Sequence, residues 1–217
     1  MAPSLAAMFV LTLLGGLGAP ARAEQELGRA ILSLERCSTA ERLNVRLACE
    51  RLREVEVGSR EEFHFMTVLD ERGGPPQIPG RALFEGQSLE ESGGGLCAVA
   101  GAVHAAALRA SLGVIERSGH SARVRTLPRG LDAAVSESGR TDLVLWNPYP
   151  FAIRLHLRML SGAAMEARWT ALEAGSRALL YRDENGALVR RLPDGREEIL
   201  DPAPFNSGGK ARVSGVE

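Results

Sequence analysis

The sequence predicts an α+β fold in which a buried, alanine-rich helix packs against a mostly antiparallel sheet. Residues 97–108 are apolar on nearly every side of a helix, which is typical of a helix inside a core. Short stretches of alternating apolar and polar residues then follow one another with turn residues between them, which favours strands that pair with their neighbours in sequence. A central helix beside sequential strands indicates α+β rather than a doubly wound α/β fold.

The N-terminus has the form of an export signal. Residues 5–17 are an apolar run, and Ala21, Arg22 and Ala23 before Glu24 have the small-x-small form that signal peptidase cuts. A membrane anchor is the alternative, but a spanning helix needs about 20 apolar residues and this run is shorter. We therefore expect a signal peptide over 1–23, no permanent membrane span, and a periplasmic or secreted location in a bacterial cell envelope.

The rest of the chain divides by composition into three parts. With 45% hydrophobic and 24% charged residues, a chain of this length can bury a sizeable core. We expect that core in an α+β domain over 24–170. A small β-meander over 171–200 is indicated by Asn-Gly and Asp-Gly turn signals, and a disordered tail over 201–217 by its Pro, Gly and Ser content.

Elements can be placed in order along the α+β domain. Apolar spacing predicts helices over 26–34 and from Ser38 to about Leu52, the second beginning with a capping box. Alternation predicts a strand over 61–69, and glycine and proline predict an exposed loop over 73–80. The further strands that alternation predicts are 114–117, 122–127, 142–146 and 151–157.

A glycine-rich turn places one cysteine at the N-terminus of the buried helix. Free backbone N–H groups and the positive end of the helix dipole stabilise an anion at such a position. A histidine and an aspartate follow in the chain, so the order is nucleophile, base and orienting acid, as in papain-like enzymes. The predicted catalytic residues are Cys97, His120 and Asp132, and a papain-like arrangement is one candidate for the fold. The residues expected to bind substrate beside the thiol are Gly93, Gly94, Gly95 and Leu96.

Each of these residues has a simpler alternative role. Cys97 can be a small residue that lets the helix start pack tightly, His120 a surface histidine, and Asp132 a turn carboxylate that satisfies its own backbone. His104 lies about 10.5 Å along the helix from Cys97, too far for a Cys–His pair, so we expect a packed histidine there. A zinc site that adds His64 to this set lacks the short ligand spacing of known zinc patterns, and we expect no metal and no cofactor.

The three cysteines cannot all pair with one another. In an oxidising compartment, an odd count leaves one thiol free or intermolecular. We expect a disulfide between Cys37 and Cys49, with a chain reversal at Ser38, and a free thiol at Cys97. Three small buried thiols are the alternative.

The surroundings of Cys97 resemble the VanW-domain proteins, a family named for an accessory component of some vancomycin-resistance clusters. The matching blocks are NVRLACE at 44–50, EFHF at 62–65, GGGLC at 93–97, IER and GHS at 115–121, and LPRGLDA at 127–133. The family usually continues after the Cys with Gln-x-Ser-Ser-Thr-Leu-Tyr. The residues that depart from this pattern are Ala98, Ala100, Gly101, Ala102 and His104, so this chain is a divergent member.

The resemblance implies a cell-envelope context but no particular reaction. From the residues themselves we expect an exported, papain-like thiol hydrolase or acyltransferase that acts on peptidoglycan peptides or another envelope acyl substrate. The alternative is a non-catalytic envelope module that binds wall peptides or a protein partner through the glycine-rich groove. A net charge of −1 argues against nucleic acid as a partner.

Overall fold

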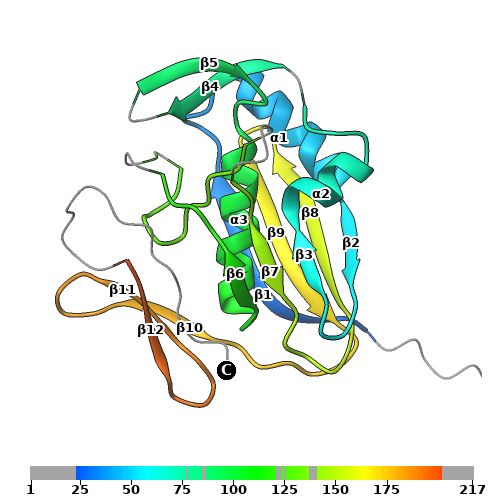
Figure 1. Ribbon diagram of the computed structural model, residues 1–217, viewed down its shortest axis with the longest axis vertical. Helices are drawn as coiled ribbons and strands as arrows, with labels where there is room; N and C mark the ends of the chain where they lie inside the picture. Colours follow the sequence, from blue (N-terminus) through cyan, green and yellow to red (C-terminus); the bar gives the residue numbers. More distant parts are fainter. Residues whose placement is uncertain are drawn as a thin grey trace, which may run out of the picture.

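The central sheet of the protein is antiparallel, and a buried helix packs along one of its faces. The computed structural model describes residues 23–76, 78–84, 87–120, 124, 126–136 and 141–201, with the backbone alone described for 80–84 and 87–92. The strands of the central sheet, in spatial order, are β1 (Gln25–Ser33), β9 (Ala164–Ala171), β8 (Ile153–Ser161) and β2 (Glu54–Val57). Helix α3 (Leu96–Arg109) packs along β1 and β9 (Figure 1). The predicted α+β fold, with a buried alanine-rich helix on an antiparallel sheet, is confirmed.

Helix α3 is rich in alanine because it lies almost in contact with the backbone of β1. A Cβ atom at Gly28 would lie 2.4 Å from the carbonyl oxygen of Ala106 and 2.5 Å from the backbone nitrogen of Ala110. Larger residues on either side would push the helix off the sheet. Trp169 of β9 fills the core next to the helix, and its indole N–H donates to the carbonyl of Val103 at 3.4 Å.

Helix α1 (Thr39–Arg51) begins where the sequence predicts. The side chain of Ser38 accepts a hydrogen bond from the N–H of Glu41, and the Glu41 carboxylate accepts one from the N–H of Ser38, which is the predicted capping box. The apolar side of α1 buries Val45 and Ala48 against the core, and the helix packs on α3.

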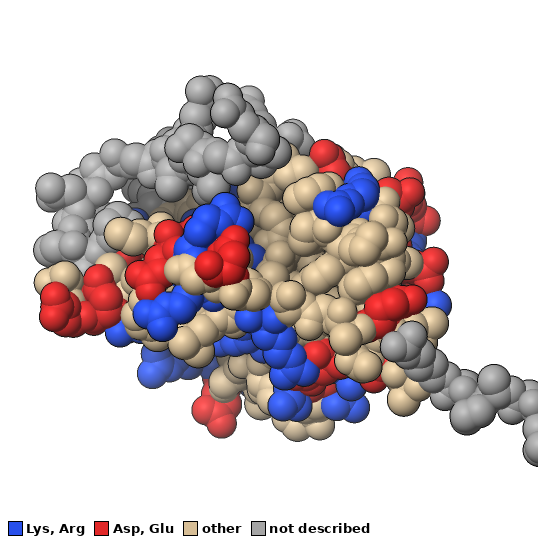
Figure 2. Space-filling model, turned by 90° about the horizontal axis from the view of Figure 1, so that it is seen from below, with Lys and Arg blue, Asp and Glu red and all other residues tan. Residues whose placement is uncertain are grey.

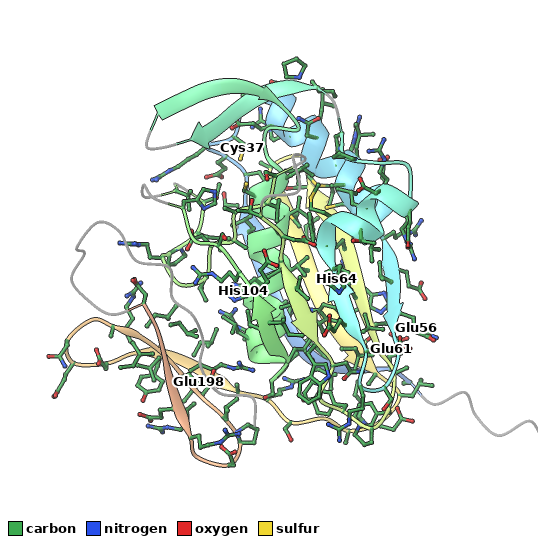
Figure 3. All side chains as sticks on the ribbon, in the orientation of Figure 1. Cys37, Glu56, Glu61, His64, His104 and Glu198 are labelled. Atoms are coloured by element: carbon green, nitrogen blue, oxygen red, sulfur yellow. The ribbon has the colours of Figure 1, made fainter. Side chains whose placement is uncertain are left out.

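The predicted disulfide between Cys37 and Cys49 is not present, because all three cysteines are free thiols in the structure. The chain reversal expected at Ser38 comes before α1, so Cys37 precedes the helix and Cys49 lies on its last part, with no break between them. The rise of that helix separates Ser38 from Cys49 by about 16 Å. A bridge needs Cα atoms within about 7 Å. Figure 3 places Cys37 at the end of the molecule where α1 begins.

A second, smaller sheet lies beside α3. Its strands, in spatial order, are β3 (Glu62–His64), β7 (Val144–Trp146) and β6 (Gly113–Glu116). The strand predicted over 61–69 is correct only in its first part, because α2 (Phe65–Glu71) follows directly. Phe65 and Leu69 lie one helical turn apart and are both buried, and the Asp142 carboxylate accepts from the N–H of Met66 in the first turn. A hairpin of β4 (Pro79–Phe84) and β5 (Gln87–Ser92) was not predicted.

The helix predicted over 26–34 is wrong, because this segment is β1. It pairs with β9 along its length, with Ala30 opposite Ala167 and Leu32 opposite Met165. Leu32 is buried and Ile31 is exposed, which is the period of two of a strand with one buried face. The partner strand β9 is far away in the sequence and was not predicted, and strand formation depends on the partner more than on local preference.

The predicted C-terminal meander is confirmed. It consists of β10 (Leu179–Arg182), β11 (Leu188–Arg191) and β12 (Glu197–Asp201). Two contacts attach it to the C-terminal end of α3: the N–H of Ala178 donates to the carbonyl of Arg109 at 3.0 Å, and the guanidinium of Arg190 donates to the carbonyl of Leu112 at 2.8 Å. Figure 2 shows basic and acidic side chains intermixed on the face seen from below.

Several predictions fall on residues that the structure does not describe. They are the signal peptide up to residue 22, the tail after residue 201, and half of the strand expected over 122–127. Among the described residues, no helix has the length and apolar character needed to cross a membrane.

Candidate functional site

The N-terminus of α3 is fixed by a glycine turn that rests on α1. Gly95, the N-cap, has φ of 105°, and a Cβ atom there would lie 2.8 Å from the carbonyl oxygen of Glu41. Both the backbone conformation and the contact therefore require glycine. Asn44 of α1 is fully buried, and its amide donates to the carbonyls of Gly94 at 2.9 Å and Ile78 at 2.7 Å. Helix α1 thus holds the glycine turn in place, and the turn fixes the position of the first residues of α3.

Cys97 is the second residue of α3 and is half-buried. Its thiol donates to the carbonyl of Val135 at 3.5 Å. The N–H groups of its two neighbours in sequence bond back to the glycine turn, whereas no hydrogen bond between described residues uses the N–H of Cys97 itself. A free N–H beside a thiol at a helix N-terminus is a suitable donor to an oxyanion.

His120 and Asp132 form a close pair next to Cys97. The ring Nδ1 of His120 lies 2.9 Å from Oδ2 of Asp132, and the backbone N–H of His120 donates to the same oxygen at 2.8 Å. An ionised carboxylate only accepts hydrogen bonds, so Nδ1 carries a proton. That leaves Nε2 free of the carboxylate, and Cys97 lies close enough to the ring to raise its pKa. The structure therefore pairs His120 with Asp132 and brings Cys97 within interacting range of the ring.

The charges in this group are strongly coupled. Burial alone would lower the pKa of His120, but the hydrogen bonds to Asp132 and Cys97 and their negative charges outweigh it and raise the pKa to about 9. Burial would raise the pKa of Asp132, but the hydrogen bonds from His120 and the charge of Arg117 hold it well below its usual range. The side chains of His120 and Asp132 are only 7% and 5% exposed, so water screens this pair weakly.

Arg117 completes the group and had no individual role in the sequence analysis. Its guanidinium donates to Oδ1 of Asp132 at 3.1 Å and to the Asp132 carbonyl at 2.7 Å. The N–H of Gly130 donates to the same Oδ1 at 3.2 Å, so the alternative role of Asp132 as a turn carboxylate is also present. The only local signal for Arg117 was a basic residue at the end of a strand shortly before His120.

The other histidines take no part in this group. His104 is 1% exposed on α3 and its Nδ1 lies 3.1 Å from the carbonyl oxygen of Leu131, which confirms the packed histidine (Figure 3). Burial and then the charge of Arg117 lower the pKa of His104 to about 3. His64 lies apart from it on β3, paired with Glu62 at 3.0 Å (Figure 3). Within the described ranges, no three His, Cys, Asp or Glu side chains cluster closely enough to hold a metal ion.

Comparison with known proteins identifies a family for this chain. The family model described as VanW like protein matches residues 40–169. Uncharacterized protein YoaR of Bacillus subtilis (strain 168) is 28% identical over 142 residues, which cover 64% of this chain and 46% of that relative. The chain therefore spans less than half the length of this relative. No solved structure matches, so the papain-like arrangement stays a prediction. Because the matched residues make up more than half of the chain and include Cys97, His120 and Asp132, the protein belongs to the VanW-like family.

Proposed function

We propose that the protein is a cell-envelope thiol hydrolase or acyltransferase whose catalytic residues are Cys97, His120 and Asp132. The observation that carries this proposal is the buried His120 ring, which bonds to Asp132 through Nδ1 and whose pKa is raised by both Asp132 and Cys97. A nucleophile, a base and a group that orients the base are the three parts that acyl transfer through a thiol requires.

The geometry suggests a role for each group in the reaction. The Cys97 thiolate attacks the acyl carbon of the substrate, and the N–H of Cys97 donates to the oxyanion that forms. His120 gives its Nε2 proton to the leaving amine as the carbon–nitrogen bond breaks, which leaves an acyl group on sulfur as a thioester. Water or a second amine then attacks the thioester while His120 takes up its proton, and the thiolate leaves. Water as acceptor gives hydrolysis, and an amine gives acyl transfer.

The proposed substrate class follows from the proposed cellular location of the protein rather than from the shape of the site. Membership of the VanW-like family and the export-signal form of residues 1–23 support a periplasmic or secreted location. Amide bonds of wall peptides are the abundant acyl substrates of that compartment. We therefore propose peptidoglycan peptides, or another acyl group of the envelope, as the substrate.

One observation favours a second candidate, a non-catalytic module that binds a wall peptide or an envelope protein. Ala98, Ala100 and Ala102 are 7%, 0% and 0% exposed, and none has a polar side chain that could help Cys97 hold an oxyanion. A site with fewer polar groups can still bind a peptide beside Cys97 without reacting with it.

Two measurements separate the enzyme from the binding module. Wild-type protein should release peptide products from peptidoglycan fragments, and Cys97→Ser should abolish release while keeping the wild-type circular dichroism spectrum. Cys37→Ser is the matched control and should retain activity, because Cys37 precedes α1 and its thiol has no part in the proposed mechanism. Product release that persists in Cys97→Ser would exclude the thiol mechanism. Fragment binding without product release, unaffected by Cys97→Ser, would favour the module.

A further inference from the structure

The loop that carries Asp132 runs along one stripe of α3. The helix residues on this stripe are Cys97, Gly101 and His104, which recur at helical spacing on one side. At its first point of contact, the thiol of Cys97 meets the carbonyl of Val135. At the second, a Cβ atom on Gly101 would lie 3.5 Å from the backbone nitrogen of Ala133, so the loop backbone passes close over the helix there.

The third point of contact is a hydrogen bond in which His104 is the donor. A carbonyl oxygen only accepts, so Nδ1 of His104 carries the proton in its 3.1 Å contact with the carbonyl of Leu131. His104 is 1% exposed, so water does not compete for this bond. The carbonyl of Leu131 belongs to the peptide unit that continues into Asp132. Fixing this carbonyl therefore fixes the backbone from which the Asp132 carboxylate extends.

The same loop also contacts the C-terminal meander. Gly130 has φ of 81°, and a Cβ atom there would lie 3.0 Å from Cδ2 of Leu188 and 3.1 Å from the carbonyl oxygen of Leu200. Leu131 is 7% exposed and packs in one apolar cluster with Leu188. The meander lies beyond residue 169, where the family match ends. An element outside the shared domain thus touches the loop that holds the acid of the site.

We infer that His104 is a positioning residue that aims Asp132 at His120, and that the meander completes a clamp by packing on the same loop. This inference rests on the proposed function, since it assigns a role in the same group of residues. His104 itself touches neither the sulfur nor the reacting atoms. Its effect passes through the carbonyl of Leu131 to the carboxylate of Asp132, and from there to the His120 ring.

The test compares two substitutions of His104 in the full chain. His104→Leu puts an apolar side chain of similar size in place of the imidazole and removes the donor. It should lower the pKa of His120, measured by NMR titration, by about one unit. It should also slow the alkylation of Cys97 by iodoacetamide at pH 7 about tenfold. His104→Asn retains an N–H near the position of Nδ1 and should restore both values to near the wild type. If His104→Asn lowers the His120 pKa and the Cys97 alkylation rate as much as His104→Leu does, the hydrogen bond has no such role and the inference is wrong.

Val103→Ala is the matched control for a purely structural effect. Val103 is fully buried on α3, and its carbonyl accepts from Trp169 of the central sheet. The Val103→Ala substitution should lower the free energy of unfolding without changing the pKa of His120 or the rate at which Cys97 is alkylated. If His104→Leu changes only stability, as Val103→Ala does, the inference is wrong.

A variant in the meander covers the case in which His104→Leu does not fold. Leu188→Ala should loosen the clamp from the meander and lower the pKa of His120 in the same direction, and an unchanged pKa would contradict the clamp. The proposed function fails separately, if the wild-type protein releases no product from peptidoglycan fragments while the His104 variants still shift the His120 titration.

Discussion

One oxygen of Asp132 accepts two hydrogen bonds from His120, from the backbone N–H at 2.8 Å and from ring Nδ1 at 2.9 Å. The first bond fixes the position of the residue, and the second fixes the orientation and tautomer of the ring. Because the pair is buried, turning the ring away would leave its Nδ1–H without an acceptor. The second ring nitrogen, Nε2, therefore stays free of the carboxylate.

Asp132→Asn should remove most of the stabilisation of the charged His120 ring. The substitution takes away a negative charge and an ionic hydrogen bond, so the pKa of His120 should fall from about 9 toward its ordinary value of 6.5. NMR titration of the ring measures this directly. Asp142→Asn is the control, since that carboxylate bonds to the backbone of Met66 and Leu143 instead, and it should leave the His120 curve in place. Equal curves in Asp132→Asn and the wild type would contradict the pairing.

Protonation of His104 should destabilise the fold in acid. Its folded-state pKa of about 3 lies below the ordinary 6.5, so the ring contributes stability above pH 6.5 that is lost as the pH falls toward 3. Over that window the loss is about 1.4 kcal/mol per pH unit. His104→Leu cannot take up this proton, so the difference in free energy of unfolding between the wild type and the variant should narrow between pH 7 and pH 4. Urea unfolding at fixed pH values measures it, and a constant difference would be the contrary result.

Gly95→Ala should disturb the site more than its size suggests. The new Cβ atom would lie 2.8 Å from the carbonyl oxygen of Glu41, and the residue would hold a φ of 105° that alanine disfavours. We expect a loss of about 2–4 kcal/mol in the free energy of unfolding and slower alkylation of Cys97. Gly162→Ala is the control, because a Cβ there meets nothing within 4 Å, and it should be nearly neutral. If both variants lose the same amount of unfolding free energy, the turn at Gly95 does not require glycine.

The thiols should differ in access rather than pair with one another. Cys49 is buried, and burial with the charge of Glu50 raises its pKa to about 12. In the folded protein, iodoacetamide should therefore modify Cys97 long before Cys49. After unfolding without reductant, mass spectrometry should find three alkylated cysteines. A peptide that joins Cys37 to Cys49 would restore the disulfide that the sequence predicted and would require α1 to be broken.

The parts of the fold that could be predicted have local causes. The capping box at Ser38 and Glu41 and the all-apolar pattern after Cys97 are complete within one or two helical turns, so both helices begin as predicted. The segment from Gln25 to Ser33 was misassigned because its structure depends on pairing with β9, more than a hundred residues later. Helix α2 was missed because a short run with Phe63 and Phe65 fits a strand as well as a helix until its neighbours are known.

The sequence predicted the candidate catalytic residues but not the residues that hold them in place. The glycine turn and the order of Cys97, His120 and Asp132 are visible in the sequence. The contacts of Asn44, Arg117 and His104 are not, because each one bonds to a loop or carboxylate that only the folded chain brings near. Such contacts are set by tertiary packing, and a single sequence carries no spacing rule for them.

The most direct test of the central claim is the pKa of His120 in the wild type and in Cys97→Ser, measured by NMR with Cys37→Ser as the control. The account predicts a pKa of about 9 in the wild type and in Cys37→Ser. It predicts a clearly lower value in Cys97→Ser, because a neutral hydroxyl supplies neither the charge nor the ionic hydrogen bond of a thiolate. A His120 that titrates identically in all three proteins would show that the sulfur and the imidazole do not act as a pair.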